Sequence, residues 1–235
     1  MSDIFYGSSL MTYIILVLPA VLLAMWASAN VNSTFKKYSK IRSASGYTGY
    51  DSARRILDAN GLTDVKIEHI SGELTDHYDP KAKVIRLSDA VYANDSAAAI
   101  GVAAHEAGHA VQHATGYFPL KIRNAIIPVC NIGSNLAMPL IILGLVLDVL
   151  GLCYIGIAAF GLSALFQLIT LPVEFNASSR ALVALKESGR FSDEDLSNAK
   201  KTLSAAALTY VAALAVALAN LLRLILMVSG GRRRR

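Results

Sequence analysis

The segment from Asp95 to Ala114 reads DSAAAIGVAAHEAGHAVQHA, and its centre is the pattern His105-Glu106-Ala107-Gly108-His109. Because the segment is rich in alanine, the sequence predicts a helix over this range. Residues four apart lie on one face of a helix, so His105 and His109 can direct both imidazoles at one point. Two neutral imidazole nitrogens that converge in this way are typical of a metal site.

Two further residues of this pattern support the interpretation. Glu106 lies one position round the helix from His105, where its carboxylate is not a ligand but could accept a proton from a water molecule that the metal activates. Gly108 costs about 1 kcal/mol of helix stability relative to Ala, which indicates that another segment approaches the backbone closely there. The pattern also recurs by chance in helices, so its context has to be considered.

The composition excludes an ordinary soluble domain. Of the 235 residues, 54% are hydrophobic, and the mean hydropathy is +0.46. About 20 apolar residues are needed to cross the roughly 30 Å hydrocarbon core of a bilayer. Four segments meet this requirement: 10–29, 126–147, 149–171 and 203–226. We expect the first to be a retained anchor, because it lacks the basic start and the cleavage site of a signal peptide.

These spans divide the chain into five regions. We expect an N-terminal transmembrane anchor in 1–31, a cytoplasmic region with a small sheet and the metal helix in 32–123, and a transmembrane hairpin in 124–173. Cytoplasmic helices with a third metal ligand should occupy 174–201, and a C-terminal transmembrane helix with a basic tail should occupy 202–235. The predicted fold class is a mainly α membrane protein with about four transmembrane helices and a small cytoplasmic α+β region of zincin-like design.

The distribution of basic residues predicts the side of the membrane. No Lys or Arg precedes Lys36, whereas Lys36, Lys37, Lys40 and Arg42 follow the first span. The positive-inside rule therefore places the N-terminus outside and the polar segments after spans one and three in the cytoplasm. Topology and lipid-headgroup contacts explain the net charge of +5 better than nucleic-acid binding does. The tail Arg232–Arg235 opposes this rule, and its side of the membrane stays open.

A change in periodicity predicts the small sheet. Residues 65–69 alternate, with Lys66 and Glu68 at the charged positions, and residues 84–87 form a second β-rich run. The turn residues Asp79-Pro80-Lys81 precede this run, so the segment before them can pair across the turn. We expect a small antiparallel sheet directly before the metal helix. In zinc peptidases of this design, an edge strand near that helix holds an extended substrate by main-chain hydrogen bonds.

The hairpin returns the chain to the side that carries the metal helix, and Glu174 is the first charged residue after that return. A catalytic zinc takes three protein ligands and keeps one position open, and two histidines with one glutamate are an established set. Glu174 is therefore the candidate third ligand, with Asn176 or Ser178 as a hydrogen-bond partner of a ligand. His113, one turn beyond His109, lies too far along the helix to join the same ion. We interpret it as structural or as a proton relay.

The sequence does not select the group that stabilises the transition state. His77 could approach the metal from the sheet as a hydrogen-bond donor, but we favour its interpretation as a loop residue. Arg180 and Tyr210 are further candidates for an oxyanion partner.

Three motifs together resemble the YugP-type bacterial membrane zinc metallopeptidases, and more distantly the HtpX and CAAX-prenyl-protease group. These motifs are Lys83-Val-Ile-Arg-Leu-Ser88, His105-Glu-Ala-Gly-His109 and, after a membrane hairpin, Leu171-Pro-Val-Glu174-Phe-Asn-Ala-Ser178. The resemblance covers about Thr48 to Leu185. It implies zinc, held by the two histidines of the pattern and by Glu174, with Glu106 as general base. Ser178 stands where the distant group has an aspartate, so no acidic orienting group is available at that position.

The sequence thus predicts a zinc metallopeptidase of the HExxH, gluzincin type in a bacterial cell membrane. It would hydrolyse peptide bonds of membrane or membrane-proximal proteins at the cytoplasmic face. The alternative is a catalytically silent zinc-binding scaffold or partner-docking protein, which a closed site with His113 or His77 as fourth ligand would favour. A transporter is disfavoured, because the spans contain no ion pair and no repeated halves. No pattern indicates the substrate, the regulators or the oligomeric state.

Overall fold

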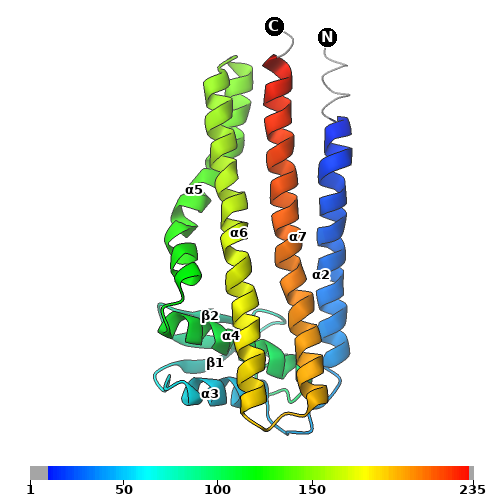
Figure 1. The fold of residues 1–235 in the computed structure, drawn as a ribbon, viewed down its shortest axis with the longest axis vertical. Coiled ribbons are helices and arrows are strands. Elements are labelled where there is room, and N and C mark those ends of the chain that lie inside the picture. Colours follow the sequence, from blue (N-terminus) through cyan, green and yellow to red (C-terminus); the bar gives the residue numbers. More distant parts are fainter. Residues whose placement is uncertain (1–9, 233–235) are drawn as a thin grey trace. The chain divides into compact units, whose positions relative to one another are not determined.

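The computed structural model describes residues 10–232. Its helices and strands are η1 (Tyr13–Val17), α2 (Leu18–Tyr38), α3 (Gly49–Ala59), β1 (Lys66–Ile70), β2 (His77–Asp79), β3 (Val84–Ser88), α4 (Ala97–Ala114), α5 (Phe118–Val146), α6 (Leu150–Glu187) and α7 (Asp193–Arg232), as Figure 1 shows. The expected external tail, residues 1–9, and the last three residues of the arginine tail lie outside the described residues.

The chain divides into two compact units, which we call the membrane unit and the site unit. Within the described residues, the membrane unit comprises 10–27, 122–171 and 209–232, and the site unit comprises 28–121 and 172–208. Helices α2, α5, α6 and α7 each contribute residues to both units. The fold is therefore mainly helical, with one small sheet.

Within residues 10–232, four helices are long and apolar enough to cross a membrane, in agreement with the expected number. They are Leu10–Tyr38, Phe118–Val146, Leu150–Glu187 and Asp193–Ser229. Only 11–28% of the residues in their most apolar windows are buried. Their side chains thus face outward, as expected where the surroundings are lipid rather than water.

Small residues hold α5 and α6 together in the membrane unit. A Cβ atom at Gly156 of α6 would lie 2.8 Å from the Ala137 carbonyl oxygen of α5, so only glycine permits this approach. The hydroxyl oxygens of Ser134 and Ser163 lie 2.6 Å apart between the same helices. Small residues and shared hydroxyls are the usual means of packing helices in lipid, where burial of apolar area supplies little driving force. The predicted hairpin is present, with Asp148 in its turn at φ 55°.

The sheet of the site unit has the strand order β1-β3-β2. Strand β2 is antiparallel to β3, and β1 is parallel to β3 with Lys66 opposite Val84. The expectation of an antiparallel sheet is correct for β2 and wrong for β1. The reason is that the turn after Asp79 joins only β2 and β3, whereas β1 lies at the other edge of β3 and runs in the same direction. Strand β2 is therefore an edge strand.

Helix α3 has a capping residue before its start and a glycine after its end. The Thr48 side chain and the Asp51 side chain form a capping box at its start, and Gly61 follows its end at φ 71°. Its apolar face, with Ile56 and Leu57, is buried in one cluster with α4 and β3. The helix is thus a support for α4.

Helix α4 confirms the predicted metal helix almost to the residue. The Ser96 side chain accepts a hydrogen bond from the Ala99 backbone N–H at its start, and Gly116 follows its end at φ 64°. Most of its alanines are fully buried. Small side chains on all sides let α3, α6, α7 and the sheet lie close to its backbone, and this proximity positions the candidate site.

Candidate metal centre

His105, His109 and Glu174 lie together in the site unit, with their donor atoms all within 4.8 Å of one another. The Nε2 atoms of His105 and His109 lie 3.3 Å and 3.5 Å from Oε2 of Glu174. The Glu174 side chain is 6% exposed, and the two histidine side chains are 15% and 13% exposed. The structure therefore brings together the three ligands that the sequence predicts, from α4 and α6.

Gly108 explains how α6 comes so close to α4. A Cβ atom at this position would lie 2.6 Å from the carbonyl oxygen of Ala177 on α6. Ala177 is three residues after Glu174, almost one turn along the same helix. Glycine between the two histidines thus permits the backbone approach that places the glutamate opposite them, as the sequence analysis anticipated for this position.

Ser178 supports the first histidine. Its Oγ lies 3.1 Å from Nδ1 of His105, so the serine is a hydrogen-bond partner of a predicted ligand. A hydroxyl thus occupies the place where the resemblance led us to look for an acidic group. Such partners fix the orientation of a metal-binding imidazole.

Gln112 supports the second histidine, and a chain of hydrogen bonds fixes its orientation. The Gln112 Nε2 group donates to the Val173 carbonyl at 2.8 Å and to Asn176 Oδ1 at 3.0 Å. The Arg180 Nε–H donates to the same Asn176 oxygen at 2.8 Å. Gln112 Oε1 is therefore the atom that faces His109 Nδ1, at 3.0 Å. An amide oxygen can only accept a hydrogen bond. His109 consequently carries hydrogen on Nδ1 and presents Nε2 to Glu174.

This tautomer decides what can occupy the space between the donors. When Nδ1 of neutral His109 is protonated, its Nε2 lone pair faces a carboxylate oxygen, and two electron-rich atoms at this distance need a cation between them. Ligand bonds of about 2.0–2.2 Å in a tetrahedral zinc site separate the ligand atoms by roughly 3.3–3.6 Å. The observed separations of 3.3 Å and 3.5 Å agree with this geometry. The residues fit a zinc ion.

The electrostatic environment also favours a cation. Burial by itself would lower the pKa of His109, but the Glu174 carboxylate and the charge of Glu106 more than offset it, so the pKa of this imidazole is raised. Glu106 itself is 8% exposed. No other group in residues 10–232 forms a hydrogen bond with its carboxylate, which leaves the oxygens available to a reactant.

Asp76, the residue directly before β2, lies close enough to Glu106 to be affected by its charge. Asp76 accepts hydrogen bonds from the Ser88 backbone N–H at 2.7 Å and from the Ser88 hydroxyl at 3.0 Å. Burial raises the pKa of Asp76, and the negative charge of Glu106 contributes to the same shift. The partly buried Asp76 carboxylate thus ties the start of β2 to the end of β3.

Among the described residues, the other predicted ones do not belong to this metal-binding group. His113 Nδ1 is 2.9 Å from the Tyr78 hydroxyl of β2, and His77 Nδ1 is 2.9 Å from the Thr75 carbonyl oxygen. Neither histidine belongs to the metal-binding group that the described residues form. Besides its bond to Asn176, the Arg180 guanidinium lies 5.8 Å from the Tyr117 ring centroid. Tyr210, the remaining oxyanion candidate, lies on α7.

Gln112 is the site residue that the sequence analysis missed. The side chain is fully buried, and it lies three residues after His109. The available signal was a single amide at helical spacing from a predicted ligand, in a helix whose other polar side chains are three histidines and Glu106. Helical spacing places such a residue on the face of the second histidine.

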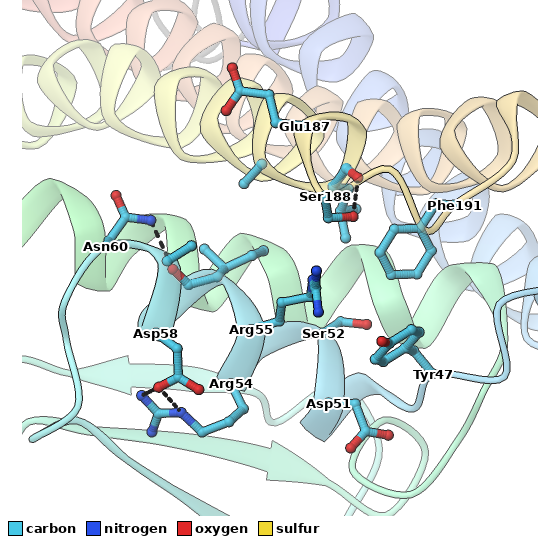
Figure 2. A pocket seen from close by; sticks show the side chains of 14 residues that line it. Tyr47, Asp51, Ser52, Arg54, Arg55, Asp58, Asn60, Glu187, Ser188 and Phe191 are labelled. Atoms are coloured by element: carbon cyan, nitrogen blue, oxygen red, sulfur yellow. Dashed lines mark hydrogen bonds and ion pairs between the residues drawn. The ribbon is translucent and has the colours of Figure 1, made fainter.

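A cavity of about 700 Å³ elsewhere in the site unit contains none of these residues. It lies between α3 and the C-terminal end of α6, and Tyr47 and Phe191 face each other at one end of it (Figure 2). Its polar walls serve α3: the Arg54 guanidinium binds Asp58 and the Leu62 and Val65 carbonyls. These contacts stabilise the end of α3, and none of the predicted metal ligands lines the cavity.

Comparison with known proteins agrees with this geometry. A family model described as "Putative neutral zinc metallopeptidase" matches residues 13–229. The chain belongs to this metallopeptidase family. Membership implies zinc. A relative from Bacillus subtilis (strain 168), described as "Putative membrane protease YugP", is 49% identical over 222 residues, which cover 94% of this chain and 99% of the relative. No solved structure gives a significant match.

Proposed function

We propose that this chain is a membrane-embedded zinc metalloendopeptidase of the gluzincin type. It hydrolyses peptide bonds of membrane or membrane-proximal proteins at the cytoplasmic face. The observation that carries the proposal is the convergence of three side chains: one donor atom each of His105, His109 and Glu174 lies within 4.8 Å of the other two. Three protein ligands leave one tetrahedral position for a reactant, which distinguishes a catalytic zinc site from a closed structural one.

Zinc in this position supplies a Lewis acid that polarises a carbonyl oxygen and makes water more acidic. The residues of the chain carry out the proton transfers. The Glu106 carboxylate takes one proton from the attacking water as the oxygen–carbon bond forms. It then delivers this proton to the amine as the carbon–nitrogen bond breaks. The products are a carboxylic acid and an amine, and Glu106 returns to its starting state.

Positioning residues keep the ligands in place. Ser178 orients His105, and Gln112 orients His109 from the other side. Asn176 and Arg180 fix the Gln112 amide, so that its oxygen rather than its nitrogen meets the imidazole. This arrangement gives Asn176 and Arg180 an indirect role in metal binding. It also gives the Arg180 Nε–H a positioning role.

The edge strand β2 supports an extended peptide as the substrate. It borders α4, and the Tyr78 side chain contacts His113 of that helix. An unfolded segment can add a further strand to such an edge through main-chain hydrogen bonds, with little dependence on its side chains. A substrate segment close to the membrane is the natural partner, because Glu174 follows the apolar part of α6 by only a few residues.

The basic residues after the first span support a cytoplasmic site. Lys36 and Lys37 lie in the last turn of α2, and the sheet and the metal helix follow. The proposed regions are the anchor 1–31, the cytoplasmic region 32–123, the hairpin 124–173, the ligand-bearing helices 174–201 and the last span 202–235.

Glu106→Gln tests the proposed reaction. We expect hydrolysis of casein by the purified protein in detergent to fall by about 10²–10⁴-fold, the usual contribution of a general base, while bound zinc stays unchanged. Glu187→Gln, at an exposed position near the end of α6, serves as the matched control and should keep full activity. Unchanged hydrolysis by Glu106→Gln would remove this glutamate from the reaction. No hydrolysis by a zinc-loaded wild-type protein would favour the zinc-binding scaffold instead.

Labelling of single introduced cysteines tests the side of the membrane. A reagent that does not cross membranes should leave Lys81→Cys unlabelled in intact cells and label it after lysis. Leu147→Cys, in the turn between α5 and α6, is the control and should react in intact cells. The reverse pattern would place the site outside.

A further inference from the structure

A groove with basic and hydroxyl side chains lies in the site unit, between the C-terminal part of α2 and the N-terminal part of α7. It has a volume of about 660 Å³, and we call it the basic groove. The side chains that matter here are Thr34, Lys37 and Tyr38 of α2 and Lys200, Lys201 and Ser204 of α7. None of the predicted metal ligands lines it, so it is separate from the candidate metal centre.

The lysines of the basic groove lack acidic partners. No Asp or Glu lines the groove, and within residues 10–232 none of its three lysines forms an ion pair with a carboxylate. Elsewhere in the same unit Lys83 does pair, with Asp64 at 2.6 Å. The sequence thus places three positive charges along one groove without local neutralisation.

Two of these charges converge on one aromatic ring. The Nζ atoms of Lys37 and Lys201 lie 5.2 Å and 5.6 Å from the centroid of the Tyr38 ring. The ring attracts each ammonium group, but the two groups repel each other. An anion between the two ammonium groups would attract both of them and offset their mutual repulsion. The hydroxyls of Thr34 and Ser204 add hydrogen-bond donors beside the ammonium groups, and this combination suits the charged oxygens of a phosphate.

The position of the groove along its two helices points to the source of the phosphate. In α2 the apolar run ends at Ala29, and the groove residues follow within three turns. In α7 Lys200 and Lys201 come just before the apolar run that starts at Leu203, with Thr202 between them. The headgroup region of a bilayer extends about 5–8 Å beyond the hydrocarbon core on each side. Lysines at this depth meet lipid phosphates, and their long side chains can reach along the helix to that level.

We propose that the basic groove binds the phosphate group of an anionic membrane lipid. Lys37, Lys200 and Lys201 supply the charge, Tyr38 holds two of the ammonium groups together, and the hydroxyls complete the contacts. The bound headgroup bridges the membrane-proximal ends of α2 and α7. This site is independent of the metal centre and of the proposed peptidase reaction.

Native mass spectrometry of the full chain in uncharged detergent tests this site. We expect phosphatidylglycerol to bind more tightly than phosphatidylcholine of the same chain length. The triple variant Lys37→Gln, Lys200→Gln, Lys201→Gln should bind phosphatidylglycerol about a hundredfold more weakly, from about fivefold for each lysine near a charged headgroup. The triple variant Lys66→Gln, Lys81→Gln, Lys186→Gln has the same change in net charge outside the groove and should bind as the wild type does.

The remaining outcomes separate the possible ligands. Competition by inorganic phosphate at concentrations similar to the lipid would assign the groove to free phosphate and would overturn the lipid as its source. Equal losses in the two triple variants, or equal binding of both lipids by the wild type, would overturn the site itself. If the groove variant does not fold, each single lysine variant should still show its fivefold loss, and three single variants without any loss would contradict the proposal.

Discussion

In both the membrane unit and the site unit, a glycine allows two helices to pack closely, but the consequences differ. In each of them a glycine lets the backbone of a second helix approach: Gly156 faces the Ala137 carbonyl in the membrane unit, and Gly108 faces the Ala177 carbonyl in the site unit. Beside Gly156 lie atoms of Ile141 and the Ala137 backbone, and this approach holds the hairpin together. Gly108 stands between His105 and His109 in the sequence, and the approach of the Ala177 backbone there brings Glu174 to the candidate metal centre.

The comparison teaches that close packing alone does not indicate function. What distinguishes the site unit is the buried polar groups that the packing brings together. Glu174, Glu106 and Gln112 are all buried within this unit, where a polar group without a partner is costly. We expect changes at these groups to affect metal binding, and changes in the hairpin to affect stability alone.

The largest effect should follow the loss of the carboxylate ligand. Structural four-ligand zinc sites bind with about 10–16 kcal/mol, or roughly 3 kcal/mol for each ligand, so Glu174→Ala should weaken zinc binding by about a hundredfold or more. Competition with a chromophoric chelator measures this affinity. His113→Ala is the control and should bind zinc as the wild type does. Full affinity in Glu174→Ala would move the third-ligand role to another residue.

Gln112→Ala should have the next largest effect on the metal. Without the amide oxygen, the Nδ1 hydrogen of His109 has no fixed acceptor, and loss of such a partner typically costs 10–100-fold in metal affinity. Gln112→Glu keeps an acceptor at this place and should restore much of the affinity. If the Ala and Glu variants bind zinc equally well, the amide does not orient the histidine.

The two glycines give a direct contrast between the units. Gly108→Ala forces its Cβ against a backbone oxygen, and overpacking of this kind costs about 1–3 kcal/mol; it should lower both Tm and zinc affinity. Gly156→Ala meets a similar obstacle and should lower Tm while zinc affinity stays the same. Gly151→Ala, with no atom within 4 Å of the added Cβ, controls for the substitution itself. A loss of zinc in Gly156→Ala would show that the two units are not independent.

Acid should produce the smallest effect, and only in the site unit. Lys83 beside Asp64, and Arg42 beside Asp95, lower the pKa of each carboxyl below its usual range. A lowered pKa means that the folded state binds fewer protons, so this stabilisation is complete above about pH 4 and is lost as the pH falls further. Amide hydrogen exchange on either side of this pH should report faster opening near β3 than in the hairpin. Asp64→Asn should remove part of the difference, whereas equal sensitivity of both units would contradict it.

Much of the fold could be predicted, because its signals are local. The four apolar runs can be read from composition along the chain, and the pattern from His105 to His109 acts over little more than one helical turn. The direction of β1 could not be predicted, since it depends on which edge of β3 the strand occupies. That choice is made by contacts between distant residues, such as the hydrogen bond that the Lys66 backbone N–H donates to the Lys83 carbonyl oxygen.

The candidate site shows the same division between local and distant information. The helical period places His105, His109 and Gln112 on related faces, although Gln112 was overlooked. Glu174 was predicted from the topology of the hairpin and from a family resemblance. Its contact with the histidines crosses 65 and 69 residues of sequence, and only the structure supplies the distance. The hydrogen bonds that link Arg180 to Asn176 and Asn176 to Gln112 could not be foreseen, because they depend on the orientations of two side-chain amides.

Zinc K-edge X-ray absorption of the purified wild-type chain tests the central claim most directly. The proposed site predicts one zinc per chain with two imidazole nitrogens and oxygen donors at about 2.0–2.2 Å, consistent with His105, His109, Glu174 and one water. A sphere with three or four imidazoles, or a chain that binds no zinc at all, would contradict it.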